Sequence, residues 1–392
     1  MLMGDSNVLI LGGCGFVGRN LVSYLVDNKL CKYIRVIDKT RPSLAYLSER
    51  HKKAFESDIV SYEQANVRSP SSLASSWTKS GKEFHYVFNL ASETRYAQDS
   101  VIYNENIVSI VKIVIAEIKK HPSVKRVFDI STNQVYNMHD KKILVTEDSA
   151  TNPKSPLAAH KLTAEGLWLE SGLPVIILRS ATIYGLGDIR GLSPLFACAR
   201  VYAELKQKLV MLWSDNSQLK LVHVMDVCRA LWHLTDHGDA RKIYNICCDK
   251  VITSADLCRC TENLFGIRIK MANRLFCKLS RLNIQYIIDY ANLKHLKVWT
   301  KLCNRSGIES TPVTPVVYEE NIRSPSYPSI DVSLLLSTNF EFKYPSLHES
   351  ILKEQLNYWV DQGVFPPLET QEVLETDILS GSESLDKYIE GL

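Results

Sequence analysis

The sequence predicts a doubly wound α/β fold, in which helices cover both faces of a parallel sheet. Two observations support this fold class. Through residues 1–185, β-rich runs alternate with stretches of helical periodicity. The strand segments are almost continuously apolar, as strands buried on both faces must be. The chain has 392 residues, more than a single core usually holds, so we also expect a smaller mixed α/β carboxy-terminal lobe.

The elements of the first part are recognised by short apolar runs for strands and 3.6-residue spacing for helices. The expected strands are Val8–Leu11, Tyr33–Ile37, Tyr86–Leu90, Arg126–Ser131 and Val175–Leu178. The expected helices are Val17–Val26, Val101–Lys119 and Ala158–Glu170. We therefore expect one α/β domain over residues 1–186, to which later strands can return.

After Gly187 the alternation loosens, and we expect a second lobe over residues 187–367. Residues 251–310 hold ten Lys or Arg against four Asp or Glu. Two interpretations stay open for this basic segment: solvated faces of lobe helices, or contact with a membrane surface or an anionic substrate. Residues 368–392 hold seven acidic residues and one lysine, which predicts a flexible tail that could bind a protein partner.

Charge and cysteine usage bound the class of protein. The net charge is +3, from 46 basic and 43 acidic residues, so no global field favours nucleic acid. None of the ten cysteines forms a Cys-x-x-Cys pair, so we expect reduced thiols and no metal site. Residues 1–7 lack a secretory pattern, and the longest apolar stretch, Ile107–Ile118, is too short and too charged to span a bilayer. We therefore expect a cytoplasmic protein with no transmembrane segment.

A glycine-rich loop, Gly12-Gly13-Cys14-Gly15-Phe16-Val17-Gly18, follows the first expected strand and leads into the first helix. Glycines allow a sharp turn, a close approach of backbone N–H groups to a pyrophosphate, and tight packing of helix on strand. The helix amino terminus then faces the phosphate charge. The loop predicts a dinucleotide cradle. Its predicted cofactor-binding residues are Gly12, Cys14, Gly15, Phe16, Val17 and Gly18.

Asp38 ends the second expected strand, twenty residues beyond Gly18. Its carboxylate would accept hydrogen bonds from the adenosine ribose hydroxyls and repel a 2′-phosphate, which favours NAD over NADP. The nearby cations Lys39 and Arg41 weaken that preference, and Lys39 is a further cofactor-binding candidate. The alternative is that Asp38 only caps a turn.

Further segments match a known family in the same order: Ser131–Tyr136, Arg179 with Ile183–Gly185, and His223–Val227. With the glycine loop, they make the sequence resemble the extended short-chain dehydrogenase/reductases, which include nucleotide-sugar epimerases and dehydratases and hydroxysteroid dehydrogenases. The resemblance implies a Rossmann-type NAD-binding sheet, with a nucleotide sugar or sterol held between sheet and second lobe. It also implies a homodimer through the helices at residues 104–119 and 158–170.

The resemblance assigns further residues to the cofactor. It places Asp58 and Ile59 beside the adenine. It places Leu90, Ala91 and Ser92 on the nicotinamide side, and makes Asn106 a structural asparagine.

The family's catalytic pattern is incomplete in this chain. In the family a tyrosine acts as general acid or base, a lysine four residues later binds the ribose and lowers the tyrosine pKa, and a serine or threonine donates a hydrogen bond to the reacting oxygen. Lys161 and Thr132 match the lysine and hydroxyl positions, but Leu157 occupies the tyrosine position. A leucine carries no proton, and loss of a positioned acid or base costs roughly 10²- to 10⁴-fold in rate.

Three explanations of this departure stay open. His160 could replace the tyrosine, because it lies three residues after Leu157 and titrates near neutrality. A tyrosine from another element could reach the site: Tyr96, Tyr136 or Tyr184. The motif could be misaligned, although its proline, lysine and glutamate all agree. Two functions follow: an NAD-dependent epimerase, dehydratase or dehydrogenase, or a catalytically impaired relative that binds NAD and a protein partner.

Overall fold

The computed structural model describes residues 3–136, 144–212, 217–272, 283–322 and 329–368. The chain forms two compact units. The first unit comprises Met1–Gly191, Leu219–Ile252 and Ser326–Leu347, and the second comprises Leu192–Gln218, Thr253–Pro325 and His348–Leu392. Segments from beyond residue 187 thus contribute to both units.

The first unit is built on a seven-stranded sheet in the order β12-β7-β5-β4-β1-β2-β3, in which all neighbouring strands are parallel. The strands are β1 (Asn7–Leu11), β2 (Tyr33–Asp38), β3 (Val60–Gln64), β4 (Tyr86–Asn89), β5 (Arg126–Thr132), β7 (Val175–Ser180) and β12 (Lys242–Ile246). This architecture confirms the doubly wound fold class. The strand order reverses between β1 and β4, where ligands bind in such folds.

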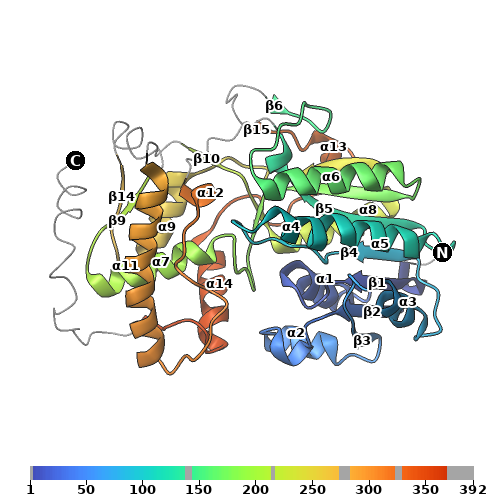
Figure 1. The fold of residues 1–392 in the computed structure, drawn as a ribbon, viewed down its shortest axis with the longest axis horizontal. Coiled ribbons are helices and arrows are strands. Elements are labelled where there is room, and N and C mark those ends of the chain that lie inside the picture. Colours follow the sequence, from blue (N-terminus) through green and yellow to red (C-terminus); the bar gives the residue numbers. More distant parts are fainter. Residues whose placement is uncertain (1–2, 137–143, 213–216, 273–282, 323–328, 369–392) are drawn as a thin grey trace. The chain divides into compact units, whose positions relative to one another are not determined.

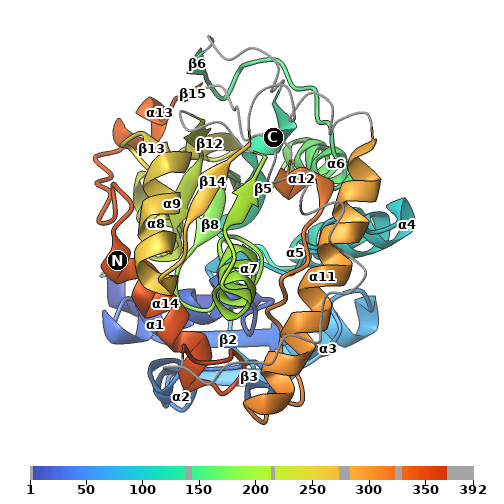
Figure 2. The ribbon, with the colours of Figure 1, turned by 90° about the vertical axis from the view of Figure 1, so that its left-hand side faces the viewer.

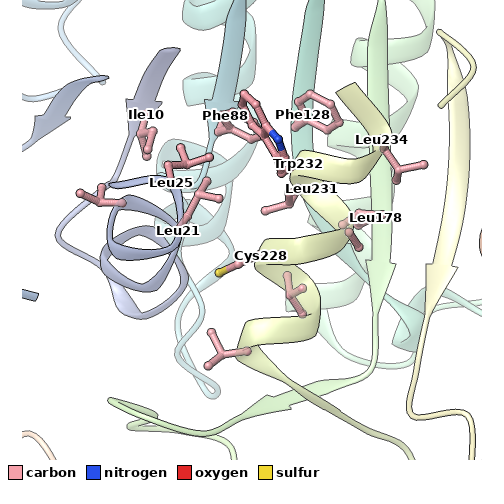
Figure 3. Close-up of a cluster of buried hydrophobic side chains, with 14 of the residues drawn as sticks. Ile10, Leu21, Leu25, Phe88, Phe128, Leu178, Cys228, Leu231, Trp232 and Leu234 are labelled. Atoms are coloured by element: carbon pink, nitrogen blue, oxygen red, sulfur yellow. The ribbon is translucent and has the colours of Figure 1, made fainter. Parts of the chain in front are cut away.

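Helices cover both faces of this sheet because successive strand side chains point to opposite sides. Val8 and Ile10 of β1 pack in one core with α1 (Phe16–Asp27) and α8 (Val224–His237) (Figure 3). Leu9 of β1 packs in the other core with three helices. These are α3 (Pro70–Thr78), α5 (Ser109–Ile118) and α6 (Pro156–Glu170) (Figure 1).

The expected helix Val101–Lys119 is interrupted by a wider, π-helical turn. It comprises α4 (Ser100–Tyr103), the π turn at Asn104–Val108, and α5. Within the turn, the carbonyl of Asn106 accepts a hydrogen bond from Glu93 N at 3.1 Å, and its side-chain amide donates to Ile102 O at 2.9 Å. Asn106 therefore ties the loop after β4 to this helix.

Several elements of the first unit have weak sequence signals. The strand β3 is a half-exposed edge strand with polar residues, and β12 returns to the sheet from far along the chain. The remaining elements are the 3₁₀ turns Met3–Asp5, Pro42–Leu44 and Asn133–Val135, the helices α2 (Glu49–Phe55) and α13 (Ser333–Leu336), and the strand pairs β6 (Leu144–Val145) with β15 (Ser329–Ile330) and β8 (Thr182–Tyr184) with β11 (Leu221–His223). Two short strands, β10 (Gln218–Leu219) and β13 (Ile252–Thr253), lie where the chain passes between units.

The second unit is mainly helical (Figure 2). Its elements are α7 (Ser193–Leu205), α9 (Ser254–Phe265), α11 (Ile284–Arg305), α12 (Glu319–Ile322), α14 (Glu349–Asp361) and the paired strands β9 (Leu209–Met211) and β14 (Ile269–Met271). Buried Ser193 accepts hydrogen bonds from Gln355 and Trp359, which joins α7 to α14. Within the described ranges, no helix is both long and apolar enough to cross a membrane.

Candidate functional site

The glycine loop lies at the carboxyl edge of the sheet, where β1 ends. Gly12 has a φ of 78°, and a Cβ there would stand 2.7 Å from Ala91 N, just after β4. A Cβ on Gly18 would stand 2.5 Å from Gly13 Cα. These two positions require glycine because the loop, the end of β4 and the first turn of α1 pack in direct backbone contact.

The loop presents backbone donors at the start of α1. Gly15 is the N-cap and supplies no capping side chain. An α-helix leaves its first N–H groups without intrahelical acceptors, so Phe16, Val17 and Gly18 present donors at the positive end of the helix dipole. A Cβ on Gly15 would meet only Gly12 O, at 3.1 Å. The loop therefore fits a pyrophosphate group.

Asp38 joins the glycine loop to the end of β2. Its Oδ2 accepts from Cys14 N at 2.9 Å and its Oδ1 from Thr40 N at 2.8 Å. The carboxylate is buried, and this burial raises the pKa of Asp38, although the N–H donors oppose the shift. Each carboxylate oxygen has a further lone pair, so Asp38 can still accept from ribose hydroxyls. Asp38 thus caps the turn and keeps acceptor lone pairs at this edge of the sheet.

The two cations near Asp38 are both exposed. The Lys39 charge partly opposes the rise in the pKa of Asp38, and the Lys39 carbonyl accepts from Gln64 Nε2 at 3.1 Å. Arg41 donates to Gln64 Oε1 at 2.8 Å. Arg41 is therefore held toward the edge strand β3.

The structure does not bring Asp58 and Ile59 to the glycine loop. Both residues precede β3, and Ile59 O accepts from Ile34 N at 2.7 Å, near the start of β2. They therefore lie at the amino edge, about 17 Å along a five-residue strand from the carboxyl edge. Sequence reasoning missed Asn66 and Val67, which follow β3 at the carboxyl edge. The β-forming residues of β3 are the sequence signal that could have identified these two positions, because residues that follow a parallel strand lie at the carboxyl edge.

Leu90, Ala91 and Ser92 follow β4 at the point where the strand order reverses. Leu90 N donates to Leu11 O at 2.8 Å, and Ala91 is the residue against which Gly12 packs. Ser92 is half-buried. Leu90 and Ala91 therefore lie beside the glycine loop.

Thr132 ends β5 and is linked to a tyrosine. Its hydroxyl accepts from Gln134 N at 3.2 Å, and Gln134 Nε2 donates to the hydroxyl of Tyr96 at 3.1 Å. Tyr96 belongs to the loop that follows Ser92. Through Gln134, the Tyr96 hydroxyl is connected to Thr132 by two hydrogen bonds.

Lys161 of α6 is buried against β5. Its Nζ donates to Ile130 O at 2.7 Å. Burial lowers the pKa of Lys161, whereas the carboxylates of Asp129 and Glu165 oppose this shift. Asp129 accepts from Asn89 Nδ2 at 2.7 Å, and burial raises the pKa of Asp129 to about 6, opposed by the Lys161 charge. The Lys161 ammonium thus bonds to the backbone of β5 two residues before Thr132, and the charges of Lys161 and Asp129 stabilise each other.

Leu157 is half-buried and packs against the core beneath α3, α5 and α6. His160 turns elsewhere: its Nδ1 lies 2.7 Å from Pro156 O, its Nε2 lies 3.2 Å from Ser100 Oγ, and its ring centroid lies 5.6 Å from that of Tyr103. These contacts direct His160 toward α4. None of them joins it to Thr132 or Lys161.

The other two tyrosines are buried among structural partners. Tyr136 donates to Asn245 Oδ1 at 2.6 Å, and Arg179 lies 4.8 Å from its ring centroid. Arg179 in turn forms a buried ion pair with Glu165 at 2.7 Å. Tyr184 is buried with its ring centroid 5.3 Å from that of His223. Of the three tyrosines, Tyr96 is the one linked to Thr132.

Comparison with known families and proteins agrees with this geometry. Residues 8–247 match the model of the NAD dependent epimerase/dehydratase family. The dTDP-glucose 4,6-dehydratase 1 of Escherichia coli is 26% identical over 267 residues, which cover 61% of this chain and 71% of that protein. The low-salt glycan biosynthesis protein Agl12 of Haloferax volcanii is 27% identical over 256 residues, covering 61% and 76%.

Solved structures share the fold. The dTDP-glucose 4,6-dehydratase of Bacillus anthracis, crystallised with NAD, superposes with a TM-score of 0.66 at 19% identity, covering 93% of this chain and all of that one. The UDP-glucuronic acid 4-epimerase of Bacillus cereus, also with NAD, gives 0.63 at 17% identity, covering 91% and 99%. The chain therefore belongs to the NAD-dependent epimerase/dehydratase family, as its resemblance to the extended short-chain dehydrogenase/reductases implied.

Proposed function

We propose that this chain binds NAD at the glycine loop and acts on a nucleotide sugar by hydride transfer. The observation that carries the proposal is the bond from Cys14 N to Asp38, which sets a carboxylate acceptor beside the N–H groups of Phe16 and Val17. Donors for a pyrophosphate and an acceptor for ribose hydroxyls then lie at one edge. A 2′-phosphate beside a buried carboxylate is disfavoured, so NAD is preferred to NADP.

The residues divide into binding and reacting roles. When bound, NAD would accept the hydride in its oxidised form and donate it in its reduced form. Ala91 and Ser92 would line the nicotinamide side. Lys161 holds positive charge near the ribose and the sugar oxygen. Thr132 donates its hydroxyl hydrogen to that oxygen. We expect Asn66 and Val67, which follow β3, to contact the adenine in place of Asp58 and Ile59, which precede it.

The proton that leaves the sugar hydroxyl needs an acceptor other than Leu157. Tyr96 is our candidate because Gln134 donates from its side chain to the Tyr96 hydroxyl and from its backbone to the Thr132 hydroxyl, which holds both hydroxyls to one residue. His160 would first have to leave Pro156 O and Ser100. Substitution can distinguish Tyr96 from His160, because under this assignment only the loss of the Tyr96 hydroxyl should reduce turnover.

The second candidate function is a catalytically impaired NAD-binding protein, in which the dinucleotide serves stability or sensing and the acidic tail binds a partner. Leu157 favours it, because the family's acid/base position carries an apolar side chain packed into the core.

Calorimetry with NAD and NADP, followed by absorbance of the bound nicotinamide with a panel of nucleotide sugars and sterols, tests both functions. The enzyme predicts NAD binding and turnover that falls at least tenfold in Tyr96→Phe. NAD binding with no turnover across the panel supports the impaired relative. Absence of binding to either dinucleotide in folded protein would refute both.

A cytoplasmic location and a homodimer through α5 and α6 also remain our proposals. Cell fractionation and light scattering would test them, and a monomer that keeps full NAD binding would refute the dimer as a requirement of the site.

A further inference from the structure

The helix α11 in the second unit presents an apolar stripe to solvent. Tyr286, Leu293 and Leu296 are 55%, 72% and 40% exposed. Their spacing of seven and three residues places them on one side of the helix. The opposite side is buried and includes Ile288, His295, Val298, Trp299 and Leu302. We call the stripe and the cations beside it the α11 outer face.

Four cations accompany this stripe. Lys294, Lys297, Lys301 and Arg305 follow one another at spacings of three, four and four residues, so they share a side of the helix adjoining the apolar stripe. Asp289 is the single acidic residue of the helix sequence. Because Arg305 is paired with Glu204, the positive charge beside the apolar stripe rests on Lys294, Lys297 and Lys301. Such a face suits an acidic amphipathic partner.

The chain beyond α14 is attached to this same helix. Buried Phe365 packs on Trp299, with ring centroids 5.3 Å apart. Pro367 O accepts from Arg200 Nε at 3.2 Å. Arg200 pairs with Glu204 at 3.0 Å, and Glu204 pairs with Arg305 of α11 at 2.9 Å. The segment from residue 369 therefore starts beside α11.

The sequence of residues 369–392 complements the outer face. Apolar residues recur at helical spacing at Leu374, Ile378, Leu385, Ile389 and Leu392. The segment carries seven acidic residues and one lysine. The 22 residues of α11 extend about 33 Å, and 24 residues reach at least about 36 Å even when helical. The tail is thus long enough to run along the whole helix.

We propose that residues 369–392 dock on the α11 outer face of their own chain. The tail's leucines and isoleucines cover Tyr286, Leu293 and Leu296, and its carboxylates face Lys297 and Lys301. Docking removes apolar surface from water and neutralises the basic stripe. The proposal concerns the second unit alone and does not depend on NAD binding.

Lysine acetylation footprinting of the full chain and of a chain ending at Leu368 tests this docking. Docking predicts that truncation raises the reactivity of Lys297 and Lys301 severalfold. Lys353, exposed on α14 of the same unit, is the internal control and should not change. Carbodiimide should also link tail glutamates to these α11 lysines in the full chain. Equal reactivity in both proteins, without such links, overturns the proposal.

A synthetic peptide of residues 369–392 provides a second measurement. It should bind the truncated protein, and its affinity should fall at least tenfold between low and high salt, as expected for opposite charges. Leu293→Ser in the protein, or Leu374→Ser with Ile378→Ser in the peptide, should weaken binding about tenfold. Leu336→Ser, exposed in the first unit, is the matched control. An unbound peptide overturns the proposal.

Two other occupants give distinct results. If links in a mixture of isotopically labelled and unlabelled protein join different chains, and truncation converts a dimer to monomer, a second copy covers the face. If the full chain binds anionic vesicles as strongly as the truncated chain, the face is open to membranes. Either result overturns intrachain docking, whereas vesicle binding only after truncation supports it.

Discussion

The carboxyl edge of the sheet has two halves that differ in what they keep of the family pattern. The binding half, defined by Gly12, Gly18 and Asp38, is complete and depends on backbone packing. The proposed reacting half, defined by Thr132, Leu157 and Lys161, has a leucine at the position that the family resemblance assigns to a tyrosine. A dinucleotide cradle relies on many main-chain groups, whereas proton transfer relies on one side chain. Binding can therefore persist where the chemistry has changed.

Restoring the tyrosine tests this contrast most strongly. Leu157→Tyr places a phenol four residues before Lys161, one turn away on the same side of α6. If Thr132 and Lys161 are otherwise competent, turnover of the preferred nucleotide sugar should rise by roughly 10²- to 10⁴-fold. Leu157→Phe is the matched control, because it adds the ring without the hydroxyl. Equal, low rates for both variants would show that the reacting half has lost more than its tyrosine.

The binding half should lose NAD affinity when its backbone is strained. In Gly12→Ala, the new Cβ meets Ala91 N at 2.7 Å while φ stays at 78°, and such strain costs about 1–3 kcal/mol. NAD affinity should fall roughly 10- to 100-fold in calorimetry. Gly166→Ala on α6, where a Cβ meets nothing within 4 Å, is the control and should slightly raise stability. Normal NAD binding by Gly12→Ala would show that the glycine loop does not form the NAD site.

The two halves should also respond to acid with opposite signs. His51 of α2 lies beside the binding half, with its Nε2 3.4 Å from Asn20 Oδ1 of α1. Burial lowers the pKa of His51 from 6.5 to about 3, so its contribution to stability is present above pH 6.5 and is lost as pH falls. In the reacting half, burial raises the pKa of Asp129 from 3.8 to about 6, so its contribution is lost as pH rises through 6. Between pH 7 and pH 5, the protonation of His51 in the unfolded chain should lower the free energy of unfolding by about 2 kcal/mol. Over the same range, Asp129 should raise the free energy of unfolding by about 1 kcal/mol.

Urea unfolding at pH 7 and pH 5 measures these contributions as differences from the unmodified chain. His51→Asn, which keeps an acceptor near Ser48 N, should reduce the loss of stability in acid. Asp129→Asn should increase that loss. Two variants that shift the acid response in the same direction would contradict the opposite signs.

The sequence predicted the central architecture well because β1, β2, β4, β5 and β7 are short apolar runs beside clear helical periodicity. It also identified the glycine loop and Asp38, which are local features. The edge strand β3 was not recognised because its polar residues alternate weakly, and this omission placed Asp58 at the wrong edge of the sheet for a ligand. The strand β12 pairs with β7 across a long sequence separation, which no local pattern encodes.

Side-chain direction at the reacting half was equally beyond the sequence. Helical spacing allowed His160 to share a side of α6 with Leu157. In the structure, however, the ring nitrogens of His160 are within hydrogen-bond distance of Pro156 O and Ser100 Oγ. Tyr96 carried no periodic or motif signal, and its hydrogen bond to Gln134 is what relates it to Thr132 in the structure. Loop residues of this kind are positioned by tertiary contacts that their own neighbours in sequence do not reveal.

The smallest effect expected is that of His160→Ala. Because the imidazole is held at Ser100 and Pro156, its removal should change NAD affinity and turnover by less than about twofold, whereas Tyr96→Phe should lower turnover at least tenfold. The pH profile of turnover gives an independent check, since a histidine base would impose an acid limb that vanishes in the variant. A tenfold loss of turnover in His160→Ala, together with that altered pH profile, would assign proton transfer to His160 of α6 instead of Tyr96.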